Sequence, residues 1–544
     1  MSNSALPAAS GVTLYRNGSI YSAADPYATA MLVDGGTVAW IGSEHAATSI
    51  ADNTMSIVDL DGRLVAPGFV DSHAHVTQTG LALSSLNLAG CASLAELLDA
   101  VAAAARQNTG PVLGHGWDET RWPEHRAPSA AELDRAAAGA EVFLTRVDVH
   151  SAVVSAALAA RLALAEVPGW TASGTVSGPA LERARHAVQA PAAGRREELQ
   201  RKALQHAASR GYVALTEMAA PQLGPAEDLL GLLALSDAEP GPRILPYWGE
   251  LMTSAGQVSE TMERFAGRLR GLGGDLTMDG SIGSHSAAIS AGYADRPGEH
   301  GSLYLETEAA ARHLELTAEA GIQAGFHVIG DAALLRVLDA LDLAAERVGQ
   351  ATVRSARPRL EHVEMLPDGA LERLLQHGVT ASMQPLFDAY WGGSDGMYAT
   401  RLGAEAALAM NAVGTMQTAG VPVAIGSDAP VTEQSPWATV KACLEHHNRG
   451  EQMSARAAFL AHTRAGWRAA GERNPMEGQL APGTPATFAV WDADELSIQT
   501  PDSRVSAWST DARAGTPMLP SLDNGRLPEC VRTVVNGITI HDAF

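Results

Sequence analysis

The sequence predicts an α/β protein: a (β/α)8 TIM-type barrel with a small β-sandwich domain built from both chain ends. Two observations lead to this fold. The middle of the chain repeats a unit in which a helical pattern ends in glycine and a short apolar strand follows, as in 320–331 (AGIQAGFHVIGD) and 419–428 (AGVPVAIGSD). Both chain ends instead carry short strands of alternating apolar and polar residues, joined by Asn-Gly or Gly-Gly turns.

The repeated unit of the middle region indicates βα units and therefore a parallel sheet. Each glycine stands where a helix C-cap is expected. Eight strands close such a barrel, and we predict them at 67–75, 213–217, 243–248, 275–279, 324–328, 359–363, 379–384 and 423–428. Between the later strands we predict helices at 309–319, 331–347, 368–377 and 403–419.

These elements divide the chain into a barrel and a smaller domain. We expect the barrel over residues 67–474 and the small β-domain over 1–66 and 475–544, because chain termini often lie close together. Strand-like runs within about 111–150 fall between the first two barrel strands and predict an insertion over the barrel mouth. The small domain and the insertion both offer surfaces for a homodimer.

Composition narrows the class of protein. The net charge of −23 argues against a nucleic-acid-binding surface. Three scattered cysteines are too few for a disulfide framework or a thiolate zinc site, which indicates a reducing compartment. We find no signal-peptide pattern at the start and no uncharged run of about 20 residues that would span a membrane. We therefore expect a cytoplasmic protein that binds neither nucleic acid nor a membrane.

Polar residues stand at the predicted C-terminal strand ends, where the catalytic groups of such barrels lie. In VAPGFVDSHAHV (65–76), His73 and His75 point the same way, because side chains alternate along a strand. An isolated pair of this kind is equally compatible with two satisfied polar histidines. Later strand ends add His327, His362 and Asp428. Four histidines and an aspartate at matching strand ends indicate a site for a divalent metal such as zinc.

Several motifs make the chain resemble the amidohydrolase superfamily of metal-dependent hydrolases, in the branch that includes N-substituted formamide deformylase. They are VAPGFVDSHAHV, GHGWDE, DGSIGSHSAA, HVIGD, LEHVE and GSDAPV. The resemblance implies that the metal is surrounded by His73, His75, His327, His362 and Asp428. It also implies a strand-four lysine that bridges two metals in carbamylated form, but Asp275 stands in that place. Because aspartate is shorter than this lysine, we expect one zinc ion, with two ions as the alternative and Asp275 as a further ligand.

The same resemblance implies hydrolysis of a non-peptide carbon–nitrogen bond in an amide, N-acyl or N-formyl compound by a metal-activated water. Asp428 is the candidate general base, and its alternative role is to cap the next helix. His362 either binds a second metal or hydrogen-bonds the developing oxyanion. Strand alternation places Glu361 on the opposite face from His362, as a strut in the core.

The candidate substrate-binding residues are His150, Trp117, Asp118, Glu217 and His285. For Trp117 the alternative is ordinary loop packing, and for Glu217 it is a buried, hydrogen-bonded carboxylate at a strand end. Two other functions remain open at this point. One is deamination of a heterocyclic amine on the same fold. The other is a non-catalytic barrel scaffold, which is expected to have lost its metal ligands.

Overall fold

The computed structural model describes residues 11–107, 110–189, 193–499, 508–509, 516–523 and 525–544. The first ten residues of the predicted small domain, and parts of its C-terminal half, lie outside these ranges.

A parallel sheet of eight strands forms the centre of the mixed α/β fold. In sheet order the strands are β7 (Phe69–Ala74), β13 (Tyr212–Ala219), β14 (Arg243–Trp248), β15 (Gly271–Leu272), β16 (Gln323–Val328), β17 (Arg359–His362), β18 (Thr380–Met383) and β19 (Val423–Ile425). The segment after β19 returns to β7, where the Asp428 amide donates to His73 O at 2.8 Å and the His75 amide to Ala429 O at 2.9 Å. The sheet is therefore a nearly closed barrel, as in TIM-type folds.

The fourth strand differs from the prediction. It covers Gly271–Leu272, whereas within 275–279 only Thr277 forms an isolated bridge, to His327. The reason is the glycine pair that follows Leu272. Gly273 and Gly274 have φ values of 91° and 59°, and this left-handed backbone ends the extended strand before Asp275.

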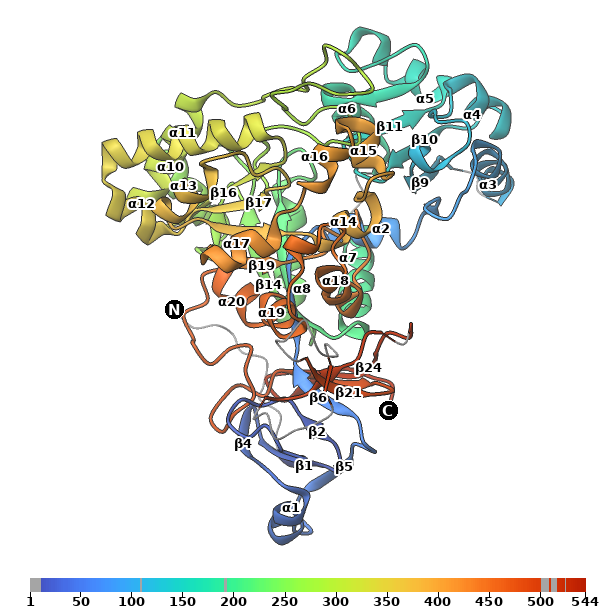
Figure 1. Cartoon of the computed structure of the whole chain (residues 1–544). Helices are drawn as coiled ribbons and strands as arrows, with labels where there is room; N and C mark the ends of the chain where they lie inside the picture. Colours follow the sequence, from blue (N-terminus) through green and yellow to red (C-terminus); the bar gives the residue numbers. More distant parts are fainter. Residues whose placement is uncertain (1–10, 108–109, 190–192, 500–507, 510–515, 524) are drawn as a thin grey trace.

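Helices cover the strands as the glycine-terminated repeat predicts (Figure 1). They include α10 (Thr307–Glu319), α11 (Asp331–Val348) and α13 (Ala370–His377). The predicted helix over 403–419 is instead two helices, α16 (Ala404–Leu408) and α17 (Val413–Ala419). Between them Asn411 has a left-handed φ of 55°, which a continuous helix cannot contain.

Strands from both chain ends share one sheet below the barrel (Figure 1). Its members are β2 (Ser19–Ile20), β6 (Leu64–Pro67), β20 (Phe488–Asp492), β24 (Glu529–Val535) and β25 (Ile538–Asp542). A second sheet contains β1 (Val12–Arg16), β3 (Ala30–Asp34), β4 (Thr37–Gly42) and β5 (Ser56–Asp59). Buried side chains of both sheets, including Val38 and Phe488, form one apolar cluster.

A further sheet lies between β7 and β13 in the sequence and beside the barrel in Figure 1. It consists of β8 (Leu86–Asn87), β9 (Val112–Trp117), β10 (Val142–Arg146), β11 (Ser151–Val154) and β12 (Thr175–Ser177). The sheet contains the two strand-like runs expected within 111–150 and extends beyond that range on both sides.

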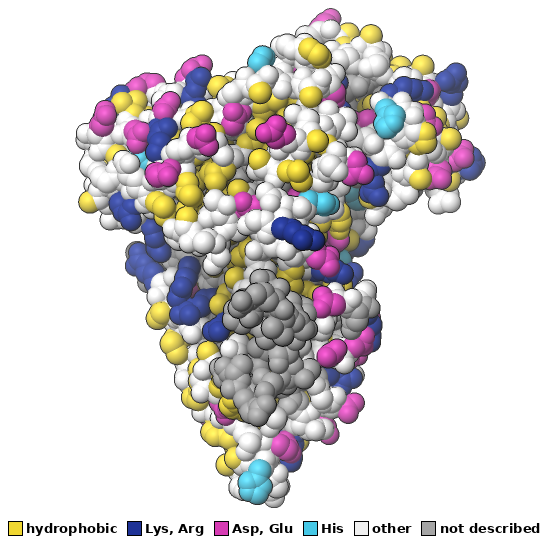
Figure 2. Space-filling view, in the orientation of Figure 1, with side chains coloured by type: hydrophobic (Ala, Val, Ile, Leu, Met, Phe, Trp, Pro, Cys, Tyr) yellow, Lys and Arg dark blue, Asp and Glu magenta, His cyan; other side chains and the backbone are white. Residues whose placement is uncertain are grey.

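The outer surface carries both signs of charge, with acidic and basic side chains interspersed over much of the face in Figure 2. Within the described ranges, none of the helices has the length and apolar character needed to cross a membrane.

Candidate metal centre

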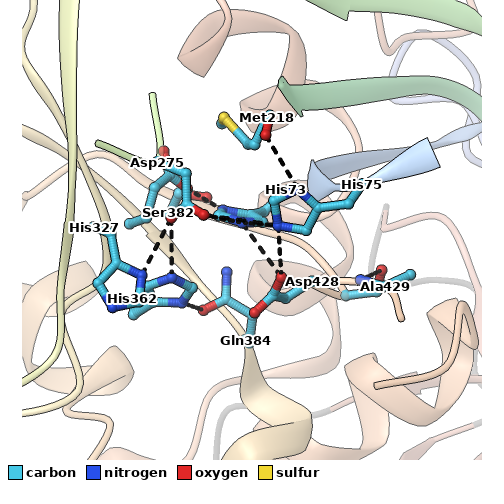
Figure 3. Close-up of polar contacts among 12 residues, drawn as sticks. His73, His75, Met218, Asp275, His327, His362, Ser382, Gln384, Asp428 and Ala429 are labelled. Atoms are coloured by element: carbon cyan, nitrogen blue, oxygen red, sulfur yellow. Dashed lines mark hydrogen bonds and ion pairs between the residues drawn. The ribbon is translucent and has the colours of Figure 1, made fainter. Parts of the chain in front are cut away.

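The predicted metal ligands meet at the C-terminal ends of five barrel strands (Figure 3). His73 lies on β7 with His75 directly after it, Asp275 follows β15, His327 lies on β16, His362 ends β17, and Asp428 follows β19. All six side chains are buried or nearly so.

One half of the cluster consists of two histidines and two carboxylates. His73 Nε2 and His75 Nε2 are 3.3 Å apart, and Asp428 Oδ1 lies 3.4 Å from each of them. Asp275 Oδ2 lies 3.8 Å from His73 Nε2 and 3.7 Å from His75 Nε2. Four potential ligand atoms therefore face one small space.

The other half uses the second oxygen of the same aspartate. Asp275 Oδ1 lies 3.2 Å from His327 Nδ1 and 3.5 Å from His362 Nε2. Asp275 thus presents one oxygen to each half of the cluster. Our expectation that an aspartate is too short to reach both halves was wrong.

Each histidine ring is oriented by an oxygen acceptor on the side away from the cluster. The pairs are His73 Nδ1 with Glu361 Oε2 (2.8 Å), His75 Nδ1 with Met218 O (3.1 Å), His362 Nδ1 with Gln384 Oε1 (2.8 Å) and His327 Nε2 with Gly280 O (3.2 Å). Because these nitrogens donate their protons outward, the nitrogens that face the cluster carry free lone pairs when the rings are neutral.

The residues present fit a divalent metal ion. His362 Nε2 is buried and has no hydrogen-bond partner among the residues that the structure describes, which is unfavourable for a polar atom unless a ligand satisfies it. Imidazole nitrogens and carboxylate oxygens are the donors that zinc and similar metals accept. Although burial opposes ionisation, the nearby His73, His327 and His362 hold the pKa of Asp275 well below its ordinary value.

An unusual backbone at the end of β17 brings Glu361 and His362 to the same site. His362 and Val363 have φ values of 71° and 47°, which interrupt the strand alternation. Glu361 therefore reaches His73 while His362 reaches the other half of the cluster. The expectation that these two side chains lie on opposite faces was wrong, whereas Glu361 is a buried support for His73, as expected of a core strut.

Asp428 also has left-handed backbone, with φ at 55°. Its carboxylate faces the histidines, whereas the hydroxyl of Ser427 accepts the Ala429 amide at 3.0 Å. The side chain of Asp428 therefore does not cap a helix, and the helix-cap alternative was wrong.

A pocket adjoins the cluster. Its apolar wall consists of Ile282, Ile329, Phe387, Trp391, Met397 and Val431. Polar groups that line it beside the candidate ligands His327, His362 and Asp428 are Asp148, His150, Ser281, Glu364 and Tyr398. Such a mixture is typical of small-molecule sites.

Of the five candidate substrate-binding residues, His150 lines this pocket. Its ring centroid lies 5.1 Å from that of His327, and burial lowers its pKa to about 4.

The other four candidates lie outside the pocket lining that the structure describes. Trp117 packs in the core of the inserted sheet and donates its indole N–H to Leu144 O at 3.0 Å. Asp118 pairs with Arg146 at 3.1 Å. His285 pairs with Asp295, at 3.0 Å. Glu217 accepts the Val76 amide at 2.7 Å, and burial raises the pKa of Glu217 to about 7.

Sequence reasoning missed four polar residues of the pocket, namely Asp148, Ser281, Glu364 and Tyr398. Asp148 stands two residues before His150, and Glu364 two residues after His362, but strand spacing does not apply to either pair, because β10 ends at Arg146 and β17 at His362. Nothing in the sequence singles out Tyr398. Its hydroxyl donates to Glu364 Oε2 at 2.6 Å, and burial raises the pKa of Glu364 to about 7.

This arrangement agrees with comparison to known proteins. A model of the amidohydrolase family matches residues 56–541. The chain belongs to the amidohydrolase family.

Several known proteins are similar to this chain over nearly their full length. Protein LONG AFTER FAR-RED 3 of Arabidopsis thaliana is 26% identical over 537 residues, which cover 91% of this chain and 90% of the relative. N-substituted formamide deformylase of Arthrobacter pascens is 25% identical, with 88% and 92% covered. An uncharacterized metal-dependent hydrolase from Pyrococcus furiosus superposes with a TM-score of 0.68 at 25% identity, covering 89% of this chain and 99% of that one. The amidohydrolase likeness therefore extends through barrel and chain ends alike.

Proposed function

We propose that the protein is a metal-dependent hydrolase that cleaves a non-peptide carbon–nitrogen bond in a small amide, N-acyl or N-formyl compound. The observation that supports this most is the position of Asp275, which offers one oxygen to each half of a histidine cluster at the floor of a small-molecule pocket. The likeness to N-substituted formamide deformylase supports the choice of bond.

We assign His73, His75 and Asp428 to one zinc ion and His327 and His362 to a second, with Asp275 shared. Divalent ions held there would polarise a scissile carbonyl and lower the pKa of a bound water molecule. His362 acts as a ligand rather than an oxyanion donor. Its Nδ1–H donates to Gln384 Oε1 at 2.8 Å, which leaves Nε2 to bind the metal.

Asp428 acts as the general base and then as the general acid of the reaction. Its carboxylate lines the pocket and lies against both histidines of one half of the cluster. Burial opposes ionisation, but His73, His75 and His362 keep the pKa of Asp428 below its ordinary value. In this role the ionised carboxylate accepts a proton from the attacking water and then delivers it to the leaving nitrogen.

The test is hydrolysis by the zinc-loaded protein of a panel of N-formyl and N-acetyl amines, followed by release of formate or acetate. The matched control is His73→Ala/His75→Ala, which should release neither. Ammonia release from heterocyclic amines, with no formate or acetate from the panel, would replace the proposal with the deaminase alternative.

A further inference from the structure

We propose that the pocket selects substrates that carry a cationic amine or amidine group, which Glu364 binds against an aromatic wall. The inference rests on the proposed function for the identity of this pocket as the substrate site. It adds the class of substrate, namely an N-acyl or N-formyl compound with a positive charge away from the scissile bond.

Glu364 is a buried carboxylate on the wall of the pocket. It is 3% exposed, lies on the pocket wall, and accepts one hydrogen bond, from the Tyr398 hydroxyl to Oε2. In the described parts of the chain, no lysine or arginine lies within ion-pair distance of it. Buried carboxylates are normally paired, so a ligand that supplies positive charge would complete this site.

Asp148 also lines the pocket, but its carboxylate has a cationic partner within the protein. Its Oδ2 lies 3.0 Å from Arg146 Nη1 and accepts the hydroxyls of Ser281 and Ser284, each at 2.7 Å. The charge of Asp148 is therefore balanced within the protein. Glu364 has no such lysine or arginine partner among the described residues, which leaves its carboxylate for a cationic occupant of the pocket.

The walls around Glu364 suit a cation with an apolar body. The ring centroids of Phe387 and Trp391 are 4.7 Å apart, and those of Trp391 and Tyr398 are 6.3 Å apart. Aromatic faces attract cations. The aliphatic side chains Ile282 and Ile329 also line the pocket, and an ion pair is stronger where apolar side chains surround it.

Binding of two small probes to the zinc-loaded protein tests the proposal without requiring turnover. Benzamidine is a planar cation that pairs with carboxylates, and benzamide is its neutral counterpart of nearly the same shape. Calorimetry should show benzamidine bound about tenfold to a hundredfold more tightly, the range expected for hydrogen bonds to a charged group.

Glu364→Gln should abolish this preference, because it keeps the shape and an acceptor for Tyr398 but removes the charge. Tyr398→Phe is the matched control, since it keeps the Glu364 charge and should keep the preference. Should Glu364→Gln fail to fold, Trp391→Leu takes its place, and the preference should fall several-fold with loss of the aromatic face.

Equal affinity of the wild-type protein for both probes, no binding of benzamidine, or a preference unchanged in Glu364→Gln would overturn the proposal. The outcome is separable from the proposed function. A preference for benzamidine in a protein that hydrolyses nothing in the N-formyl and N-acetyl panel would defeat the proposed reaction alone.

Discussion

The buried pair of Glu361 and Arg359 supports the metal centre from behind, and Glu361→Gln is the perturbation that tests this support. Both side chains are fully buried. Glu361 contacts His73 Nδ1 at 2.8 Å with one oxygen and accepts from the Arg359 guanidinium with both. Burial opposes its ionisation, but Arg359 and His73 keep the pKa of Glu361 below its ordinary value. The substitution therefore leaves a buried guanidinium uncompensated.

Removing one partner of a buried ion pair typically costs about 3–5 kcal/mol. We expect the lower end, about 3 kcal/mol, because Arg359 keeps its hydrogen bonds to the Ser72 carbonyl and the Ser382 hydroxyl. Zinc affinity should also fall about tenfold to a hundredfold, as is usual when an acceptor behind a metal-binding histidine is lost.

The assay is urea unfolding in the presence of EDTA, so that metal binding does not contribute to stability, together with a zinc titration of the folded variant. Asp237→Asn is the control, because the Asp237–Arg268 pair is exposed and should contribute less than about 1 kcal/mol. The double variant Arg359→Met/Glu361→Met should regain most of the stability but not the zinc affinity, since His73 still lacks its acceptor. A Glu361→Gln protein with wild-type stability and wild-type zinc affinity would refute the reasoning.

Three further substitutions test the site. Asp428→Asn should lower kcat by about a hundredfold to ten-thousandfold in steady-state assays, as expected for loss of a general base, and near-normal turnover would exclude that role. Gly426→Ala should destabilise the protein by about 1–3 kcal/mol and weaken zinc binding, because the new Cβ would lie 2.5 Å from His73 N. Thermal unfolding and a zinc titration measure the two effects. Unchanged stability and zinc affinity would mean that the strand can move at no cost. Trp391→Ala should raise KM about tenfold or more for substrates with an apolar group and change kcat less, whereas an unchanged KM would show that this wall does not touch the substrate.

The barrel could be predicted from the sequence because its signals are local. Glycines such as Gly378 and Gly420 end helices in the left-handed conformation, as their positions indicated. The convergence of His73, His327 and Asp428 followed from the rule that parallel strands place their C-terminal ends at one edge of a barrel.

The remaining features depend on backbone geometry or on contacts between distant segments. The short fourth strand results from the left-handed Gly273 and Gly274, and the convergence of Glu361 and His362 on one site from the left-handed backbone at His362. The reach of Asp275 to both halves of the cluster depends on where that shortened strand ends. The contact of Tyr398 with Glu364 joins residues 34 positions apart and has no local signature.

Metal content per chain, measured by elemental analysis of protein purified without added metal and again after loading with zinc, tests the central claim most directly. The account predicts two equivalents of zinc in the loaded wild-type protein and at most one in Asp275→Ala. One equivalent in both proteins would contradict the sharing of Asp275 between two ions. No bound metal, even after zinc is supplied, would contradict the metal-dependent hydrolase itself.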